Sequence, residues 1–198
     1  MISLQKLEED ILECEKHLTF LKTAFQINND LKSFAESVID DQSELSSFNE
    51  LASTVILNIH AINTISQLET SIILKSLHFA KSDFEKTYII KHAYLIIYET
   101  FKTLYHLKIN LRLMCNNELL NAEYQELETV LKRFNKFVGI DNKVQKIRNK
   151  ISGHITPSFL EYYSSLEIIN VEDDIEKVIQ FRLVLNQLND VLYKMITK

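Results

Sequence analysis

Residues 139–157 read GIDNKVQKIRNKISGHITP and contain both glycines and the only proline of the 198-residue chain. Glycine and proline end helices or allow tight turns. Gly139 and Pro157 therefore bracket one short helix, and Gly153 marks another point in this segment where the chain can turn. Because the other residues include no such helix breaker, we expect long helices on either side.

The composition indicates one globular domain. Hydrophobic residues make up 46% of the chain and charged residues 25%, as in ordinary globular proteins. A chain of this length can bury a substantial core. We expect one domain over residues 1–198, with an N-terminal helix in residues 1–30 at its periphery and the motif helix and turn in residues 140–157. Cys14 and Cys115 are too few and too far apart for a disulfide framework or a zinc knuckle.

Charge is distributed unevenly along the chain. The formal net charge of −5 argues against a protein that coats nucleic acid through bulk charge. Residues 1–50 contain eleven acidic residues and four lysines, whereas residues 132–150 contain seven basic residues and one aspartate. This basic stretch includes the bracketed helix. It is either a solvated helix face or a local surface for an anionic partner.

The sequence contains no pattern typical of secretion or membrane insertion. The N-terminus is acidic and amphipathic and lacks the apolar core of a signal peptide. No apolar run reaches the roughly eighteen residues of a membrane-spanning helix. We therefore expect a cytoplasmic protein without membrane contact.

Apolar residues recur at helical spacing along most of the chain, which predicts an all-α, antiparallel helical bundle of about five to seven helices. The first helix has the clearest pattern, with alternating spacings of three and four that are typical of coiled-coil-like packing. The residues of this seam are Leu4, Leu7, Ile11, Cys14, Leu18, Leu21 and Phe25. The seam forms a dimer contact or packs against the chain's own helices, and the sequence favours the second alternative.

Polar residues mark the expected helix ends in the first half of the chain. Asn28-Asn29-Asp30 would end the first helix, before a weaker helix over residues 31–39 and a loop over residues 40–47. Residues 48–81 are expected to form one long helix or two, with a break near Asn63.

Two residues have the side chains of helix N-caps. Ser82 would cap a helix that runs to about residue 115, is apolar on most sides, and is long enough that we expect a kink or a break. Asn170 would cap the last helix, with an aspartate three residues later. Shorter helices are expected over residues 119–138 and 158–166.

Most familiar metal and phosphate sites are excluded by the residue spacing. None of the six histidines follows a glutamate by three residues, as the ligand pairs of di-iron bundles require. Two isolated glycines cannot form a glycine-rich phosphate loop. Glu85, His92, Glu99 and His106 recur every seventh residue, but neighbours at that spacing lie about 10.5 Å apart along a helix. This spacing favours a polar stripe over a metal site, and we predict no metal and no cofactor.

Arg148 and His154 are the strongest candidates for catalytic residues. They lie six residues apart, which is about 9 Å along an ideal helix and about 240° around it, so they would not meet within one regular helix. Gly153 could end the helix and let His154 turn back toward the arginine. Alternatively, a two-fold dimer could bring two copies of the segment together.

An arginine and a histidine in one cleft could cleave RNA without a metal. The imidazole would take the proton of a 2′-hydroxyl that attacks the adjacent phosphorus, and the guanidinium would stabilise the charge on the phosphoryl group. A structural role is the alternative. In that reading Arg148 forms a surface ion pair, and His154 interacts with the C-terminal end of a helix.

The run Arg148-Asn149-Lys-Ile-Ser-Gly-His154 resembles the hallmark motif of the HEPN superfamily of helical-bundle proteins. That motif is an arginine, often followed by a polar residue such as asparagine, and then a histidine after four to six residues. The specific match covers about residues 144–157. The resemblance implies a dimer with the motifs at its two-fold interface and a metal-independent endoribonuclease active in toxin–antitoxin, abortive-infection or related defence systems.

The resemblance also implies residue roles and partners. Arg148 and His154 would be catalytic, and Asn149 would orient or support them. Lys143, Lys146 and Lys150 belong to the same basic stretch and are candidates for binding RNA. A protein antitoxin or a small nucleotidyltransferase would be the partner. Because many members of the superfamily are inactive, a non-catalytic module that binds RNA or a protein is the alternative function.

Overall fold

The structure is a computed structural model that describes residues 2–38, 44–114, 118–139, 143–148 and 159–197. All regular secondary structure in these ranges is helical, which confirms the prediction of an all-α bundle. The helices are α1 (Leu4–Val38), α2 (Glu44–Phe79), α3 (Asp83–Met114), α4 (Glu118–Val138), α5 (Gln145–Ile147), α6 (Phe159–Leu166) and α7 (Val171–Thr197).

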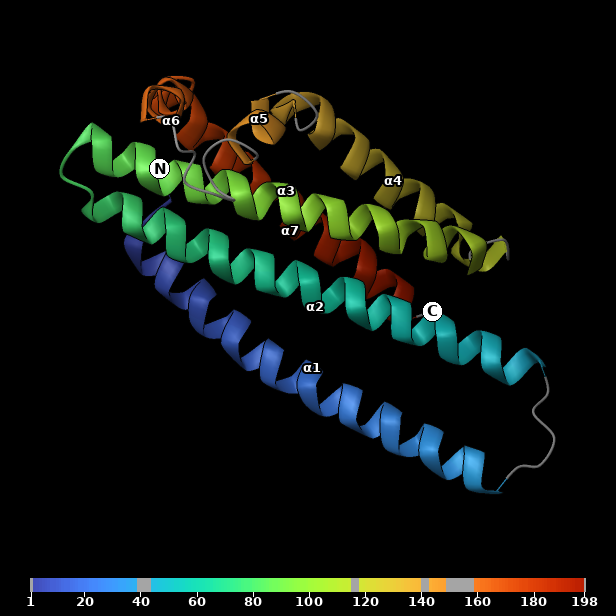
Figure 1. Cartoon of the computed structure of the whole chain (residues 1–198). Coiled ribbons are helices and arrows are strands. Elements are labelled where there is room, and N and C mark those ends of the chain that lie inside the picture. The colour runs from blue at the N-terminus through green and yellow to red at the C-terminus, as the bar shows by residue number, and fades with distance from the viewer. Residues whose placement is uncertain (1, 39–43, 115–117, 140–142, 149–158, 198) are drawn as a thin grey trace.

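Helices α2 and α7 make the most contacts with other helices. Helix α2 packs against α1, α3 and α7, and α7 also packs against α3 and α4. Figure 1 shows α1, α2 and α3 as a layer of long antiparallel helices, with α7 behind α2 and α3 and with α4 beside α3. Helix α1 lies at one edge of this layer, against α2.

The first two helices are longer than the sequence predicts. Helix α1 continues through Asn28 to Val38, so its predicted end at residues 28–30 is wrong. The reason is that the Asn28 amide donates to the Thr54 hydroxyl of α2 (3.2 Å) instead of ending its own helix. Helix α2 begins at Glu44, inside the predicted loop.

No break occurs in α2 at Asn63. This residue is fully buried, and its amide donates to the carbonyl of Leu185 in α7 (3.0 Å). A polar side chain that favours a turn in isolation is satisfied here by a neighbouring helix, so α2 runs on unbroken. Helix α3 is likewise one helix from Asp83 to Met114, without the expected break.

The predicted N-cap residues are confirmed. The Ser82 hydroxyl accepts the Glu85 backbone N–H (3.2 Å), and the Glu85 carboxylate accepts the Ser82 N–H (3.1 Å), which is a complete capping box. The Asn170 side chain accepts the Asp173 N–H (3.1 Å) at the start of α7. These caps fix where the helices begin.

The seam of α1 packs against the chain's own α2. Leu7, Cys14 and Leu21 are buried. The other residues of the seam are half-buried, namely Leu4, Ile11, Leu18 and Phe25. Beside Leu7, a buried ion pair joins Asp10 to Arg182 of α7. These contacts hold α1 to the rest of the bundle through both apolar and ionic groups.

His60 of α2 is buried, and its ring meets His17 of α1 edge to face, with centroids 4.6 Å apart. Burial lowers the pKa of His60, and the nearby His17 lowers it further. The unfolded chain, with a histidine pKa of about 6.5, therefore binds a proton that the folded chain does not, and stability falls as the pH falls below about 7.

We expect the urea midpoint of the wild type to be lower at pH 5.5 than at pH 7.5. We expect His60→Phe to make this difference between the two pH values smaller. One proton contributes at most about 1.4 kcal/mol per pH unit. His92→Phe, which removes an exposed imidazole from α3, is the matched control. Equal slopes for the wild type and His60→Phe would contradict this account.

Candidate functional site

The motif segment leaves α4 through Gly139, which has a φ of 66°. This is the left-handed region that glycine adopts most readily, so Gly139 ends α4 as predicted. The Gly139 N–H donates to the carbonyl of Asn135 (3.0 Å), and the Lys143 N–H donates to the carbonyl of Gly139 (3.1 Å). The short helix α5 follows, flanked by wider π-type turns that include Lys143 and Arg148.

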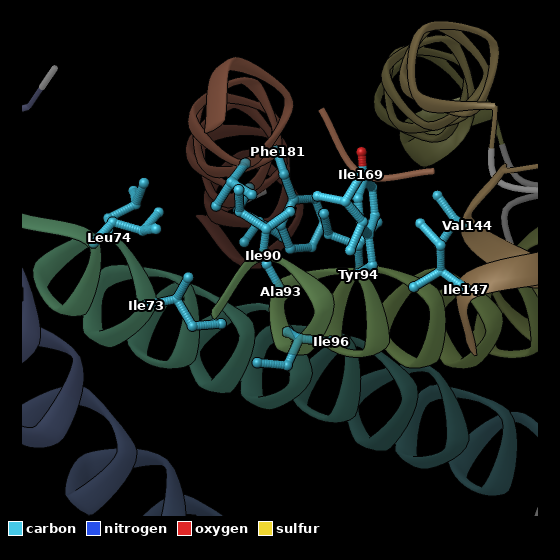
Figure 2. Packing of buried hydrophobic residues seen from close by; sticks show 14 of the residues in the cluster. Ile73, Leu74, Ile90, Ala93, Tyr94, Ile96, Val144, Ile147, Ile169 and Phe181 are labelled. Atoms are coloured by element: carbon cyan, nitrogen blue, oxygen red, sulfur yellow. The ribbon is translucent and has the colours of Figure 1, made fainter. Parts of the chain in front are cut away.

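Two apolar residues anchor this segment to the core. Val144 and Ile147 are fully buried, and Figure 2 shows them pointing into the apolar cluster around Tyr94 of α3. They lie three residues apart, which is the spacing of one helix face, so both side chains point to the same side.

A buried ion cluster fixes the start of the same segment. Asp174 of α7 is fully buried and accepts hydrogen bonds from Lys143 (2.7 Å) and Lys177 (2.7 Å). It also accepts the backbone N–H of Asn170 (3.0 Å). Burial raises the pKa of Asp174, whereas the hydrogen bonds and positive charge from the lysines lower it, and the pKa lies below its usual value. Lys143, a candidate for RNA binding, therefore holds α5 to α7 in this structure.

Arg148 reaches across to α3. Its Nε lies 3.1 Å from the Glu99 carboxylate, and its guanidinium lies 5.5 Å from the centre of the Tyr98 ring. The side chain of Arg148 remains 37% exposed and that of Glu99 45% exposed. The predicted surface ion pair of Arg148 is thus present, while the guanidinium keeps access to solvent.

The remaining candidate residues fall into two groups. Lys146 is exposed on α5, next to Arg148 along the basic segment. Asn149, Lys150 and His154 lie outside the described residues. The structure therefore brings Arg148 together with Glu99 and Tyr98.

Glu99 and Tyr98 were not predicted as site residues. The seven-residue repeat that includes Glu99 did indicate a polar stripe on α3, which was the available signal for this residue. The sequence did not indicate that α5 would bring an arginine to that stripe.

Exposed basic and aromatic side chains continue from Arg148 along α3. Tyr98, Lys102, Tyr105 and Arg112 lie within an arc of about 80° around the helix, over a rise of about 21 Å. Tyr98 is half-buried, and the other three are exposed. We call Tyr98, Lys102, Tyr105 and Arg112 the α3 row. The Arg148 guanidinium lies over the Tyr98 ring at one end of this row.

The far end of the α3 row lines a groove of about 530 Å³ between α3 and α4. Its lining includes three cations, Lys108, Arg112 and Lys132, and one carboxylate, Glu128. Lys108 (2.9 Å) and Lys132 (3.2 Å) both bind Glu128 and lower its pKa. The groove therefore has an excess of positive charge beside the exposed ring of Tyr105. Positive charge can bind the phosphates of a single-stranded nucleic acid, and an exposed aromatic ring can stack with its bases.

A larger groove between α4 and α7, of about 840 Å³, has a different character. Its lining balances two cations, Arg133 and Lys194, against two carboxylates, Glu126 and Asp190. Lys194 and Glu126 form an ion pair (3.0 Å). This groove offers an anion no net attraction.

Within the described ranges, no three His, Cys, Asp or Glu side chains are grouped as metal ligands would be. None of the helices there combines the length and apolar character needed to cross a membrane. Comparisons with protein-family models, curated proteins and solved structures found no match.

Proposed function

We propose that the chain is a HEPN-like, metal-independent endoribonuclease in which Arg148 and His154 are catalytic. The observation that carries this proposal is the placement of Arg148. Its partly exposed guanidinium stands at one end of the α3 row, which leads to a groove with excess positive charge. Although the chain as a whole is acidic, this surface offers RNA a local binding site.

The α3 row and the groove beside it both have roles in this proposal. Lys102, Arg112 and Lys132 bind phosphates, and bases stack on Tyr105 as they do on aromatic side chains of other single-strand binders. Lys146 adds positive charge beside Arg148. The RNA backbone then reaches Arg148, whose planar guanidinium can donate two hydrogen bonds to one phosphate.

The chemistry is internal transfer to a 2′-hydroxyl. His154 takes the proton of the 2′-hydroxyl, its oxygen attacks the adjacent phosphorus, and the bond to the 5′-oxygen breaks. The 5′-oxygen takes up a proton from water as it leaves, His154 releases its proton to the solvent, and the other product ends in a 2′,3′-cyclic phosphate. Arg148 stabilises the extra charge on the phosphoryl oxygens, and Asn149 supports the two catalytic side chains.

A two-fold homodimer completes the site in this proposal by bringing two copies of the motif together. We place the activity in the cytoplasm, in a toxin–antitoxin, abortive-infection or other defence role. A protein antitoxin or a small nucleotidyltransferase is the proposed partner.

An RNA with a single 2′-deoxy nucleotide tests the chemistry. In EDTA, the purified protein should cut the all-ribose strand and leave 2′,3′-cyclic phosphate ends. The strand with the 2′-deoxy nucleotide at the cut site should resist cleavage there. Equal cleavage of both strands would exclude the proposed attack by the 2′-hydroxyl.

One observation favours a second function, a non-catalytic HEPN-like module that binds RNA or a protein. Glu99 pairs with Arg148 and offsets the charge that a phosphate would meet. In the module, this ion pair is a permanent structural contact. In the ribonuclease, RNA phosphate displaces Glu99 from the guanidinium.

Glu99→Gln separates the two functions. Because an exposed ion pair contributes up to about 1 kcal/mol, the ribonuclease should bind RNA about two- to fivefold more tightly after this change, by fluorescence anisotropy. Glu126→Gln, which removes an equal charge from the α4–α7 groove, should have a smaller effect. Unchanged RNA affinity in Glu99→Gln, together with no cleavage by the wild type, would support the module.

A further inference from the structure

The groove between α3 and α4 combines apolar side chains with its three cations. Both helices pack against α7, and the groove lies between them. Its apolar lining comes from both helices and consists of Phe101, Tyr105, Ile109, Tyr124 and Leu131. The volume of about 530 Å³ lies within the range of sites that enclose a small planar molecule. The groove can therefore hold a base as well as attract a phosphate.

One ion pair shows which residues of the two helices lie opposite each other across the groove. Helix α4 runs back along α3 (Figure 1), and Lys108 of α3 binds Glu128 of α4 (2.9 Å). Tyr105 lies three residues before Lys108 on α3. Leu131 lies three residues after Glu128 on α4, which is the same level of the groove because the helices are antiparallel. The Tyr105 ring and an apolar side chain therefore stand on opposite sides of the groove.

Tyr105 and Arg112 provide contacts for two different parts of a nucleic-acid strand. The Tyr105 ring is 54% exposed, and the Lys108 ammonium lies 5.5 Å from its centre. The remaining ring surface is open to a base, which would stack on it and contact Leu131. Arg112 is exposed, and no residue of the described ranges pairs with it. It lies about 10.5 Å beyond Tyr105 along α3 and would bind a phosphate of the same strand.

Helix α3 also fixes the distance from this groove to Arg148. The Arg148 guanidinium lies over the Tyr98 ring. Tyr105 follows Tyr98 by seven residues of the same continuous helix, which is about 10.5 Å along its axis. A stacked strand advances about 3.4 Å per nucleotide. A base held on Tyr105 therefore lies within roughly three nucleotides of a phosphate held at Arg148.

We propose that the α3–α4 groove captures one unpaired base of an RNA strand and thereby sets the position of the cut. The substrate class is single-stranded RNA that has a base at one fixed position, within roughly three nucleotides of the cleaved bond. Charge complementarity selects this occupant, since three cations and one carboxylate line the groove. The position of the cut rests on the ribonuclease proposed above, whereas the capture of a base does not depend on cleavage.

The affinity for a short single-stranded oligoadenylate tests base capture, measured by fluorescence anisotropy in a His154→Ala background. Tyr105→Ala should weaken binding at least about fivefold, because stacking of one base commonly contributes that much or more. Tyr88→Ala is the matched control and should leave the affinity nearly unchanged. Tyr88 is 57% exposed on the same helix and also has a lysine over its ring (4.8 Å), but it lies outside the groove.

Two results of this measurement would overturn the proposal. One is an equal loss of affinity in Tyr105→Ala and Tyr88→Ala, or no loss in either. The other is competition by free AMP that is as tight as binding of the strand, which would identify a pocket for a free nucleotide instead of a strand.

Abasic substitution tests the fixed position. With protein below its dissociation constant, removing the base at each position around a mapped cut should slow wild-type cleavage at least about fivefold at one position. In Tyr105→Ala, the same abasic substitution should have no further effect. Wild-type cleavage that is indifferent to every abasic position would overturn this inference and leave the proposed ribonuclease intact. If the wild type cuts no RNA, the proposed ribonuclease and the fixed position both fail, and the affinities of Tyr105→Ala and Tyr88→Ala still decide whether the groove captures a base.

Discussion

Replacing Arg148 by alanine should lower the rate of RNA cleavage by at least about 100-fold, because removing one donor that stabilises transition-state charge commonly has an effect of that size. The free energy of unfolding should change by no more than about 1 kcal/mol, since both Arg148 and Glu99 are more than a third exposed. Single-turnover cleavage in EDTA and urea unfolding of the same preparation measure the two quantities.

Two further variants distinguish a specific role of Arg148 in cleavage from the general effect of removing a positive charge. Arg133→Ala removes an exposed cation from the α4–α7 groove and should retain most of the cleavage rate. Arg148→Lys keeps the charge but loses the planar fork, so it should recover only part of the rate. Equal rates for Arg148→Ala and Arg133→Ala would show that Arg148 has no special role.

Replacing Asp174 by asparagine should have the largest effect on stability, about 3–5 kcal/mol in the free energy of unfolding. The change keeps the size of the side chain but removes the charge that pairs with Lys143 and Lys177. Both ammonium groups then remain partly buried without a counter-ion. Asp173→Asn is the matched control, because Asp173 is the exposed neighbour in the first turn of α7.

The same carboxylate predicts a pH dependence. The folded pKa of Asp174 lies below its usual value, so its contribution to stability is complete above the unfolded pKa of about 3.9. The contribution is lost as the pH falls through the lower folded pKa. The wild type should therefore lose more stability than Asp174→Asn as the pH is lowered from about 4 to 2. Equal costs for Asp174→Asn and Asp173→Asn at pH 7 would contradict the role of the ion cluster.

Local features of the fold could be predicted from sequence because they depend on neighbours in the chain. The capping box at Ser82 involves residues three apart. Gly139 is a glycine at a position that requires positive φ. Val144 and Ile147 have the spacing of one helix face, and both are buried.

The errors in helix ends arose where tertiary contacts outweigh local preference. Asn28 and Asn63 have side chains that favour turns, yet each hydrogen bonds to a neighbouring helix, and α1 and α2 continue through them. At the start of α7, Asp173 was the predicted companion of Asn170. The carboxylate that accepts the Asn170 N–H is instead that of Asp174.

The candidate site was only partly predictable for the same reason. Arg148 was identified by its motif, whereas its contacts with Glu99 and Tyr98 join residues about fifty positions apart. Lys108 of α3 and Lys132 of α4 both bind Glu128, and the groove is lined by residues of these two helices. No spacing within a single helix indicates such a surface.

Cleavage of labelled RNA in EDTA by the wild type and by His154→Ala tests the central claim most directly. Because general acid–base catalysis contributes about 100- to 10,000-fold, the wild type should cut the strand and the variant should be slower by at least about 100-fold. RNA binding should be similar for the two proteins. Cleavage at the same rate by both, or cleavage by the wild type only after metal is added, would contradict a metal-independent Arg148–His154 ribonuclease.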